Sequence, residues 1–345
     1  MTITSKDVAR IAGVSQSTVS YVMSGKRPIS EETRQRVLAA IEELTYQPNA
    51  GARALAGRRT NVVGLVVPFG TGADMAGLLP FIETIASSAR AHDHDVLLVT
   101  SDEGSAGLRR LAGRALCDAI VLMDLQATDE RVPVAASLRV PVVLVGVPDD
   151  PQGLHCVDID FALAARLAVE ELAQTGHDCV TLIGYSAAMV ERRLNYMARF
   201  IDSAEETARR LGIDCVLLSP VEPGRAGAAC AVQRLLRQAP PARQDPPARH
   251  GLVVPHTEVM RPLLHALAAA GLVPGQDISV IGLSTDSDAE ESEPPLTNVS
   301  LEPRDVSRRA METLFWLVGH EGGTSPPQVA LVPPRLTRRS TVMPT

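Results

Sequence analysis

The chain has 345 residues, a net charge of −7 and 45% hydrophobic residues, so it is long enough for two or three domains with separate cores. Its five cysteines include no Cys-x-x-Cys pair, which argues against a disulfide framework or a structural zinc site and predicts reduced, buried thiols. We find no signal-peptide pattern and no apolar run of transmembrane length. We therefore expect a cytoplasmic protein without a membrane partner.

The charge is distributed unevenly along the chain. Residues 1–60 contain nine Lys and Arg against five Asp and Glu, a net charge of +4 that leaves −11 for the remainder. A basic segment on an acidic body is typical of a protein in which only that segment meets phosphate. The first sixty residues are therefore the candidate nucleic-acid-binding region.

Three short helices are predicted in this basic region. Thr4 and Asp7 form a variant of the capping box before the first helix, which ends at Gly13. The second helix covers residues 15–24 and the third about 30–44. The apolar residues expected to face inward are Val8, Ile11, Ala12, Val19, Val22, Met23, Val37, Leu38, Ile41 and Leu44. This pattern predicts a helix-turn-helix unit whose second helix reads DNA; the alternative is a small bundle whose polar face only meets solvent.

Two segments carry a family resemblance. D-V-A-R-I-A-G-V-S-Q-S-T-V-S (7–20) and Y-Q-P-N-A-G-A-R-A-L-A-G (46–57) resemble the head and hinge of the lactose-repressor (LacI/GalR) family of transcription regulators. The resemblance implies a DNA-binding domain at 1–47, a hinge helix at 48–60 that folds on operator DNA, and an effector and dimerisation domain at 61–345.

The resemblance also assigns roles in DNA binding. Gln16, Ser17 and Tyr21 are expected to read bases, and a contact to guanine is expected to be missing because many members carry arginine where Tyr21 stands. Leu55 is the expected minor-groove wedge; the alternative is a linker in which Leu55 packs on the next domain. The full predicted set is Thr4, Arg10, Ser15, Gln16, Ser17, Thr18, Ser20, Tyr21, Arg34, Asn49, Ala52, Leu55 and Ala56.

Eight short Val/Leu/Ile runs alternate with helical patterns in the rest of the chain. They are residues 61–68, 95–101, 118–125, 141–147, 179–186, 215–221, 250–256 and 278–284. Such runs predict parallel strands buried on both faces, in one closed barrel or in two doubly wound halves.

The resemblance favours two halves, like a periplasmic binding protein. It places an N-subdomain at about 61–160 and 291–325 and a C-subdomain at about 161–290 and 326–342. The ligand is expected in the cleft, at the carboxyl ends of the strands.

The expected effector site departs from the family pattern at four places. Asp160–Ala164 replaces D-N-x-x-G, Asn195 stands where an arginine is usual, Pro255–Thr257 replaces A-N-D, and Gly282–Thr285 replaces G-[FY]-D-D. Because each buried sugar hydroxyl needs a partner, an ordinary sugar pocket is not expected. One hypothesis is an altered pocket for a less polar or differently charged metabolite, lined by Phe69, Phe161, Tyr185, Asn195, His256 and Ser284. The other is a pocket that has lost its ligand, in a regulator that works without an effector.

No sequence motif indicates catalysis. Nucleophile-elbow, H-E-x-x-H and P-loop motifs are absent, and Met75 stands where a dinucleotide fingerprint needs its third glycine. We expect no enzyme activity, cofactor or metal. The sequence predicts a homodimeric repressor that binds a palindromic double-stranded operator, lies on the nucleoid when bound, and responds to an unknown small-molecule effector. The alternative is an α/β small-molecule-binding protein or enzyme with a vestigial head.

Overall fold

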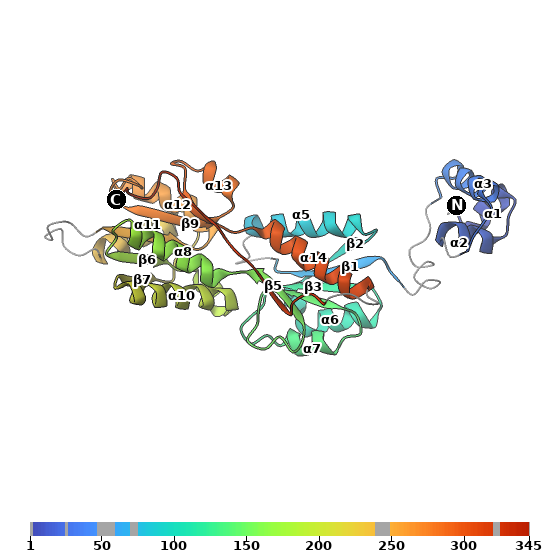
Figure 1. Ribbon diagram of the computed structural model, residues 1–345, viewed down its shortest axis with the longest axis horizontal. Coiled ribbons are helices and arrows are strands. Elements are labelled where there is room, and N and C mark those ends of the chain that lie inside the picture. Colours follow the sequence, from blue (N-terminus) through green and yellow to red (C-terminus); the bar gives the residue numbers. More distant parts are fainter. Residues whose placement is uncertain are drawn as a thin grey trace. The chain divides into compact units, whose positions relative to one another are not determined.

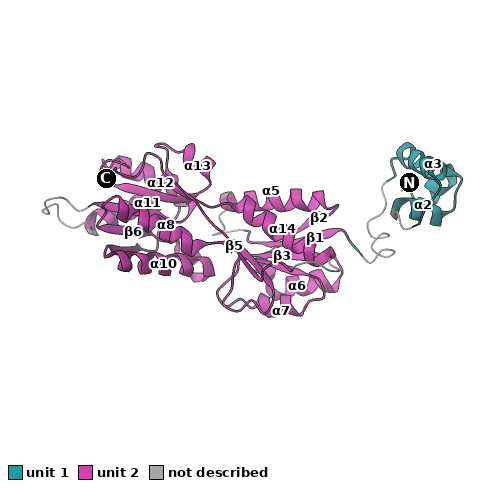
Figure 2. Cartoon of the chain, in the orientation of Figure 1, with its two compact units in different colours: residues 1–60 teal, residues 61–345 magenta. Residues whose placement is uncertain are grey.

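The structure is a computed structural model and describes residues 3–24, 27–46, 59–69, 75–238, 249–319 and 325–344. The chain divides into two compact units, residues 1–60 and residues 61–345 (Figure 2). Of the predicted hinge, residues 48–58 lie outside the described ranges, and so do the predicted contact residues Asn49, Ala52, Leu55 and Ala56.

The described part of the first unit is helical (Figure 1). Its helices are α1 (Ser5–Ala12), α2 (Gln16–Ser24) and α3 (Glu31–Glu43). The backbone nitrogen of Thr4 donates to the Asp7 carboxylate at 3.0 Å, as in the predicted capping arrangement. α1 ends at Gly13, whose φ of 65° is a conformation that glycine adopts without strain. Ser15 caps α2, since its hydroxyl accepts from the backbone nitrogen of Thr18 at 3.1 Å.

The core of this unit is small. It consists of the buried residues Val8, Ala9, Ala12, Val19, Val37 and Ala40. Three residues predicted to face inward do not: Ile11, Met23 and Leu38 are 38%, 37% and 41% exposed. The helices approach one another through alanines, so their buried faces are narrower than the apolar pattern of the sequence suggests.

The second unit begins with a six-stranded parallel sheet in the order β11-β5-β4-β3-β1-β2. Helices α5 and α14 pack against one face, and α6 and α7 pack against the other (Figure 1). The elements of this subdomain are β1 (Val62–Val67), α5 (Met75–Ala91), β2 (Asp95–Thr100), the 3-10 turn η1 (Ser101–Glu103), α6 (Gly104–Gly113), β3 (Ala119–Met123), α7 (Arg131–Ser137), β4 (Val142–Val145), β5 (His155–Ile159), α14 (Pro303–Gly319) and β11 (Val329–Val332).

A second six-stranded sheet has the order β12-β10-β9-β8-β6-β7 and is parallel except for the pair β10–β12. Helices α8 and α10 cover one face, and α11 and α12 cover the other. The elements are α8 (Phe161–Gln174), β6 (Cys179–Ile183), α9 (Ala187–Glu191), α10 (Asn195–Leu211), β7 (Asp214–Leu218), α11 (Gly224–Gln238), β8 (His250–Val254), α12 (Thr257–Ala269), β9 (Ser279–Ser284), α13 (Asp286–Glu290), β10 (Thr297–Ser300) and β12 (Leu336–Thr337).

The prediction of two doubly wound halves is confirmed, and a closed barrel is excluded. Every residue of β3 and β9 is buried, which explains the unbroken apolar runs of the sequence, because helices cover both faces of each sheet.

The chain crosses between the two sheets at different places from those predicted near residues 290 and 325. It crosses at Asp160, then between β10 and α14, and then between β11 and β12. The crossing predicted near residue 290 was misplaced because β10 has the sequence Thr-Asn-Val-Ser, which lacks an apolar run. The last crossing lies later than predicted because β11 (Val329–Val332) still pairs with β5 of the first sheet. The strand is nevertheless buried. Its polar groups are paired: the Thr297 backbone nitrogen donates to Thr341 Oγ1 at 2.9 Å, and Asn298 Nδ2 donates to the Ser284 carbonyl at 3.1 Å.

All five cysteines are free, but not all are buried. Burial raises the pKa of Cys117 to about 11 and that of Cys156 to about 12. Cys179 and Cys215 are half-buried, whereas Cys230 is exposed on α11, contrary to the prediction of buried thiols. Within the described ranges, no helix combines the length and apolar character needed to cross a bilayer.

Candidate DNA-binding and effector sites

The N-terminal half of α2 presents most of the predicted base-reading side chains. Gln16, Ser17 and Ser20 are exposed, whereas Thr18 and Tyr21 are half-buried. The start of the helix is fixed by hydroxyl contacts, because Ser15 Oγ lies 2.7 Å from Ser17 Oγ and 2.8 Å from Thr18 Oγ1. A helix held in this way offers short polar side chains to a groove without burying them.

Gln16 and Tyr21 each contact a residue outside α2. Gln16 Nε2 donates to Ser5 Oγ at 2.8 Å, which joins the start of α2 to the start of α1. The guanidinium of Arg27 lies 5.2 Å from the centre of the Tyr21 ring, a cation–π geometry. Arg27 was not among the predicted contact residues. It places a positive charge next to the position where many family members carry arginine.

Arg10 and Arg34, both in the predicted set of DNA-contact residues, lie on exposed surface. Arg10 is 3.8 Å from Asp7 and Arg34 is 3.5 Å from Glu31, and their side chains are 75% and 56% exposed. Exposed ion pairs of this kind contribute little to stability, so a phosphate can replace the carboxylate at small cost. The Thr4 hydroxyl donates to Asp7 at 2.8 Å, so its clearest role in the structure is capping.

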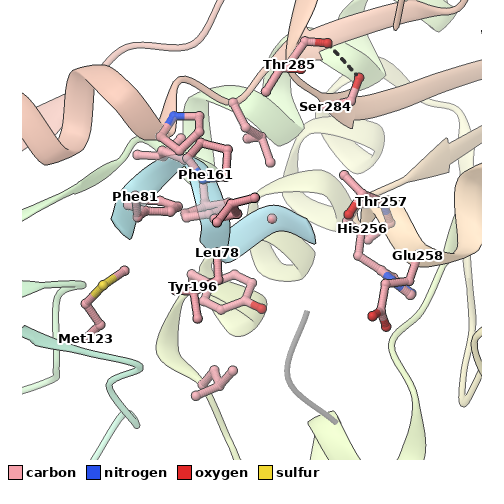
Figure 3. A pocket seen from close by; sticks show the side chains of 18 of the residues that line it. Leu78, Phe81, Met123, Phe161, Tyr196, His256, Thr257, Glu258, Ser284 and Thr285 are labelled. Atoms are coloured by element: carbon pink, nitrogen blue, oxygen red, sulfur yellow. Dashed lines mark hydrogen bonds between the residues drawn. The ribbon is translucent and has the colours of Figure 1, made fainter. Parts of the chain in front are cut away.

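A cavity of about 790 Å³ lies between the two sheets of the body (Figure 3). Both subdomains line it: Met123 ends β3 and Gly146 follows β4 in the first sheet, and Pro255 and Ser284 lie at the ends of strands of the second. Ligands of open parallel sheets bind at the carboxyl ends of strands. The cavity therefore occupies the predicted place.

Aromatic rings form one wall of this cavity. The rings of Phe161 and Tyr196 have centroids 4.8 Å apart, and Tyr185 meets Tyr196 edge-on at 6.1 Å. Tyr185 also stacks on His256 at 5.5 Å. Burial raises the pKa of Tyr185 well above its ordinary value, so its hydroxyl stays protonated behind the lining residues.

Four of the six predicted effector residues line the cavity: Phe161, Asn195, His256 and Ser284. Tyr185 is 1% exposed and lies behind the surface. Phe69 is 40% exposed and lines a neighbouring polar pocket of about 540 Å³. The prediction for Phe69 was wrong, since Phe69 is not among the residues that line the cavity, whereas the previous residue, Pro68, lines both pockets.

Sequence reasoning missed several lining residues that come from helices and from strand ends. They are Leu78, Phe81, Met123, Tyr196 and Glu258 (Figure 3). Leu78, Phe81 and Tyr196 lie on α5 and α10, where apolar side chains at helical spacing also predict ordinary core packing. The sequence offers no local signal that separates the two roles.

Polar contacts join the subdomains at one edge of the cleft. Arg192, before α10, forms an ion pair with Asp124, which follows β3. Asn195 Nδ2 donates to Asp149 Oδ1 at 2.9 Å. The backbone nitrogen of Ala127 donates to the Arg193 carbonyl at 3.1 Å. We call these contacts, together with the pair described next, the seam.

The deepest contact of the seam is an ion pair between Arg199 of α10 and Asp158 of β5. Desolvation by burial raises the pKa of Asp158 to about 6, and Arg199 offsets only part of that effect. The seam therefore contains one carboxyl group that titrates near neutral pH. Among the residues that the structure describes, no group of His, Cys, Asp and Glu is arranged to hold a metal ion.

Comparisons with known proteins agree with this architecture. Residues 4–49 match the bacterial regulatory proteins of the lacI family, and residues 169–342 match the periplasmic binding protein-like domain. Catabolite control protein A of Priestia megaterium is 29% identical over 333 residues, which cover 91% of this chain and 92% of that protein. The same-named protein of Streptococcus mutans is 30% identical over 326 residues and covers 93% and 92%.

A solved structure shows the same fold. The lac repressor dimer bound to operator and the anti-inducer ONPF superposes with a TM-score of 0.82 at 22% identity, over 99% of this chain and 100% of that chain. A helix-turn-helix head joined to a periplasmic-binding-protein-like body defines a class of DNA-binding transcriptional regulators. This chain belongs to that class, and specifically to the lacI family of bacterial regulatory proteins.

Proposed function

We propose that this protein is a homodimeric repressor that binds a palindromic operator with an affinity set by a small molecule in the cleft. The observation that carries the proposal is the joint presence of an exposed polar face on α2 and a cavity lined by both subdomains of the body. The polar face supplies base contacts, and the cavity supplies a place where a ligand can favour one arrangement of the subdomains over another.

Dimerisation is supported by apolar side chains exposed on edge strands. Leu98 of β2 is 45% exposed, and Val216 and Leu217 of β7 are 41% and 39% exposed. β2 and β7 each end their sheet, and uncovered edges of this kind favour pairing with another chain. Two copies related by a two-fold axis would present two heads, and such a pair reads a palindrome.

The seam supports the proposed coupling between ligand and DNA. Asp124, Asp149 and Asp158 belong to the first subdomain, and their partners Arg192, Asn195 and Arg199 belong to the second. A ligand that touches both walls changes the balance between open and closed subdomains. By linkage, it then changes operator affinity by the same free energy by which the operator changes ligand affinity.

The test is selection of binding sites by the full-length protein from a random duplex library at fixed moderate salt, because salt sets the level of non-specific binding. We expect enrichment of one palindrome with a flexible pyrimidine–purine step at its centre. If protein that unfolds cooperatively enriches no sequence, sequence-specific binding is contradicted. Enrichment of a single half-site would contradict the dimer only.

A further inference from the structure

We propose that the ligand of the cleft is a neutral, largely apolar molecule with one hydrogen-bond donor, such as an aromatic or alicyclic alcohol or phenol, and not a polyhydroxylated sugar. This inference rests on the proposed function, because it assumes that the cleft holds an effector. It names the chemical class that the lining residues recognise.

The walls of the cavity are apolar on both sides. Leu78 and Phe81 of α5 and Met123 at the end of β3 face Phe161 and Tyr196 of the second subdomain (Figure 3). Further apolar lining comes from Leu125, Val145, Ile159, Met189, Met260 and Leu296. A volume of about 790 Å³ holds a drug-sized molecule, and contact with such walls is favourable in proportion to the apolar area of the ligand.

Charged residues inside the cavity are paired with one another. Asp124 pairs with Arg192, and Asp158 pairs with Arg199. The remaining charges are near the exterior: Glu83 pairs with Arg304 at 3.0 Å on exposed surface, and the exposed side chains of Glu258, Arg261 and Asp288 line the rim. A charged ligand would have to displace one of the inner partners, which leaves a buried charge uncompensated.

Several polar side chains that line the cavity already donate within the chain: the Thr285 hydroxyl donates to Asp288 at 2.7 Å, and the Ser292 hydroxyl donates to the Ala289 carbonyl at 2.9 Å. The uncharged polar lining residues are Asn195, Tyr196, His256, Thr257, Ser284, Thr285, Ser287 and Ser292. Asn195 is 9% exposed and its Nδ2 already donates to Asp149, whereas its Oδ1 has no partner among the described residues. The Ser284 hydroxyl donates to the Thr285 carbonyl at 3.2 Å (Figure 3). A sugar would bury several hydroxyls against Leu78, Phe81 and Met123, and each hydroxyl left without a partner there lowers affinity. A single donor directed at Asn195 Oδ1 would pair a buried acceptor of the lining that has no partner among the described residues.

The probe is N-phenyl-1-naphthylamine, a neutral molecule with aromatic rings and one N–H, whose fluorescence rises in apolar surroundings. We expect one molecule to bind per chain of the full-length protein, and phenol-type and cyclohexanol-type competitors to displace it. Glucose and cellobiose at the same concentration should leave the fluorescence unchanged.

Two variants locate the probe and one variant is a matched control. Met123→Asn and Leu79→Asn each place an amide on the cavity wall and should weaken binding about tenfold. Leu79 is 62% exposed, so its replacement spares the fold. Leu236→Asn makes the same change at a 49% exposed position of α11 that does not line the cavity, and it should leave the affinity unchanged.

The inference is overturned if glucose or cellobiose displaces the probe, or if the probe binds Met123→Asn and Leu79→Asn as tightly as it binds Leu236→Asn. Operator binding, measured separately with and without each compound, tests the proposed function. A sugar that displaces the probe and alters operator affinity overturns the ligand class and supports regulation by an effector. Specific probe binding without any change in operator affinity supports the ligand class and contradicts regulation through it.

Discussion

In the head, six of the thirteen residues expected to contact DNA lie within residues 15–21, and Gln16, Ser17 and Ser20 of α2 are exposed. In the body, the cavity wall combines α5, α8, α10, α12 and the ends of strands from both sheets. In the head, the core residues and the residues that contact DNA are therefore different side chains. In the body, the same buried side chains pack the core and line the cavity. Substitutions should affect function and stability separately in the head and together in the cleft.

The largest effect should come from destroying the head core. Val19 is 0% exposed, and an unpaired carboxylate there costs several kcal/mol, more than a core of six small residues can supply. Val19→Asp should lower operator affinity more than a hundredfold in a binding titration. Leu38→Asp adds the same charge at a 41% exposed position of α3 and should lower affinity only a few-fold.

The body should remain folded in the Val19→Asp variant. Trp316, the only tryptophan of the chain, lies on α14, so its fluorescence reports unfolding of the body alone. The urea midpoint measured by this signal should equal that of the unmodified protein. A lower midpoint would show that the head and body are not independent units.

A second prediction concerns the proposed dimer. Leu98→Asp on β2 places a charge in the expected interface and should convert the dimer to a monomer in sedimentation at micromolar concentration. Operator affinity should fall about a hundredfold, because two half-sites are no longer bound together. Leu331→Asp is the matched control, since Leu331 is 43% exposed on β11, at the opposite edge of the same sheet. Dissociation by Leu331→Asp and not by Leu98→Asp would assign the interface to the other edge.

A third, smaller prediction tests the reading role of α2. Gln16→Ala should weaken binding to the selected operator by 1–3 kcal/mol, roughly 5- to 150-fold, and relax the preference at one base pair. Gln35→Ala removes an exposed glutamine of α3 whose Nε2 donates to Glu31 at 2.8 Å, and it should leave the preference unchanged. A uniform loss of affinity over all sequences would instead make Gln16 a residue that positions the head on the phosphate backbone.

Elements were predictable from the sequence where their contacts are local, and not where their partners lie far along the chain. The helices of the head were predictable because Thr4, Gly13 and Ser15 cap or end them through contacts within a few residues. The strands were predictable wherever helices bury both faces. β10 was not, because its polar residues find partners such as Thr341 that lie far along the chain.

The cleft was predictable only in part for a related reason. Phe161, His256 and Ser284 occupy motif positions next to a crossing or just at or after strand ends, and Asn195 occupies one at the start of α10; family patterns locate ligand contacts there. Helical lining residues carry no such mark, because burial in a core and burial in a cavity wall favour the same apolar side chains. Only the three-dimensional arrangement of the two subdomains around the cavity distinguishes lining residues from core residues.

The smallest predicted effect concerns pH. The stabilisation supplied by the carboxyl groups of the ion pairs should change with pH in opposite directions in the head and in the body. In the head, hydrogen bonds from Thr4 and Gln35 lower the pKa values of Asp7 and Glu31. The two carboxylates therefore stabilise the folded head at neutral pH, and this stabilisation is lost as the pH falls through their lowered pKa values. In the body, burial raises the pKa of Asp158 to about 6. Between about pH 4 and pH 6 the folded protein therefore keeps a proton on Asp158 that the unfolded chain has released. This proton binding adds to the free energy of unfolding in full in acid, and the added stability is lost as the pH rises through 6.

Asp158→Asn tests the body side of this contrast. The substitution removes the titrating group, so the stability of the variant relative to the unmodified protein should rise between pH 4 and pH 7 by up to about 3 kcal/mol. Urea unfolding followed by Trp316 fluorescence measures this difference at each pH. Asp149→Asn, which removes an exposed carboxylate of the same seam, is the matched control variant. If the difference between Asp158→Asn and the unmodified protein is the same at every pH, the Arg199 guanidinium outweighs burial and Asp158 is ionised throughout. The seam would then hold the subdomains together by a permanent ion pair, and the closure of the cleft would not depend on pH near neutrality.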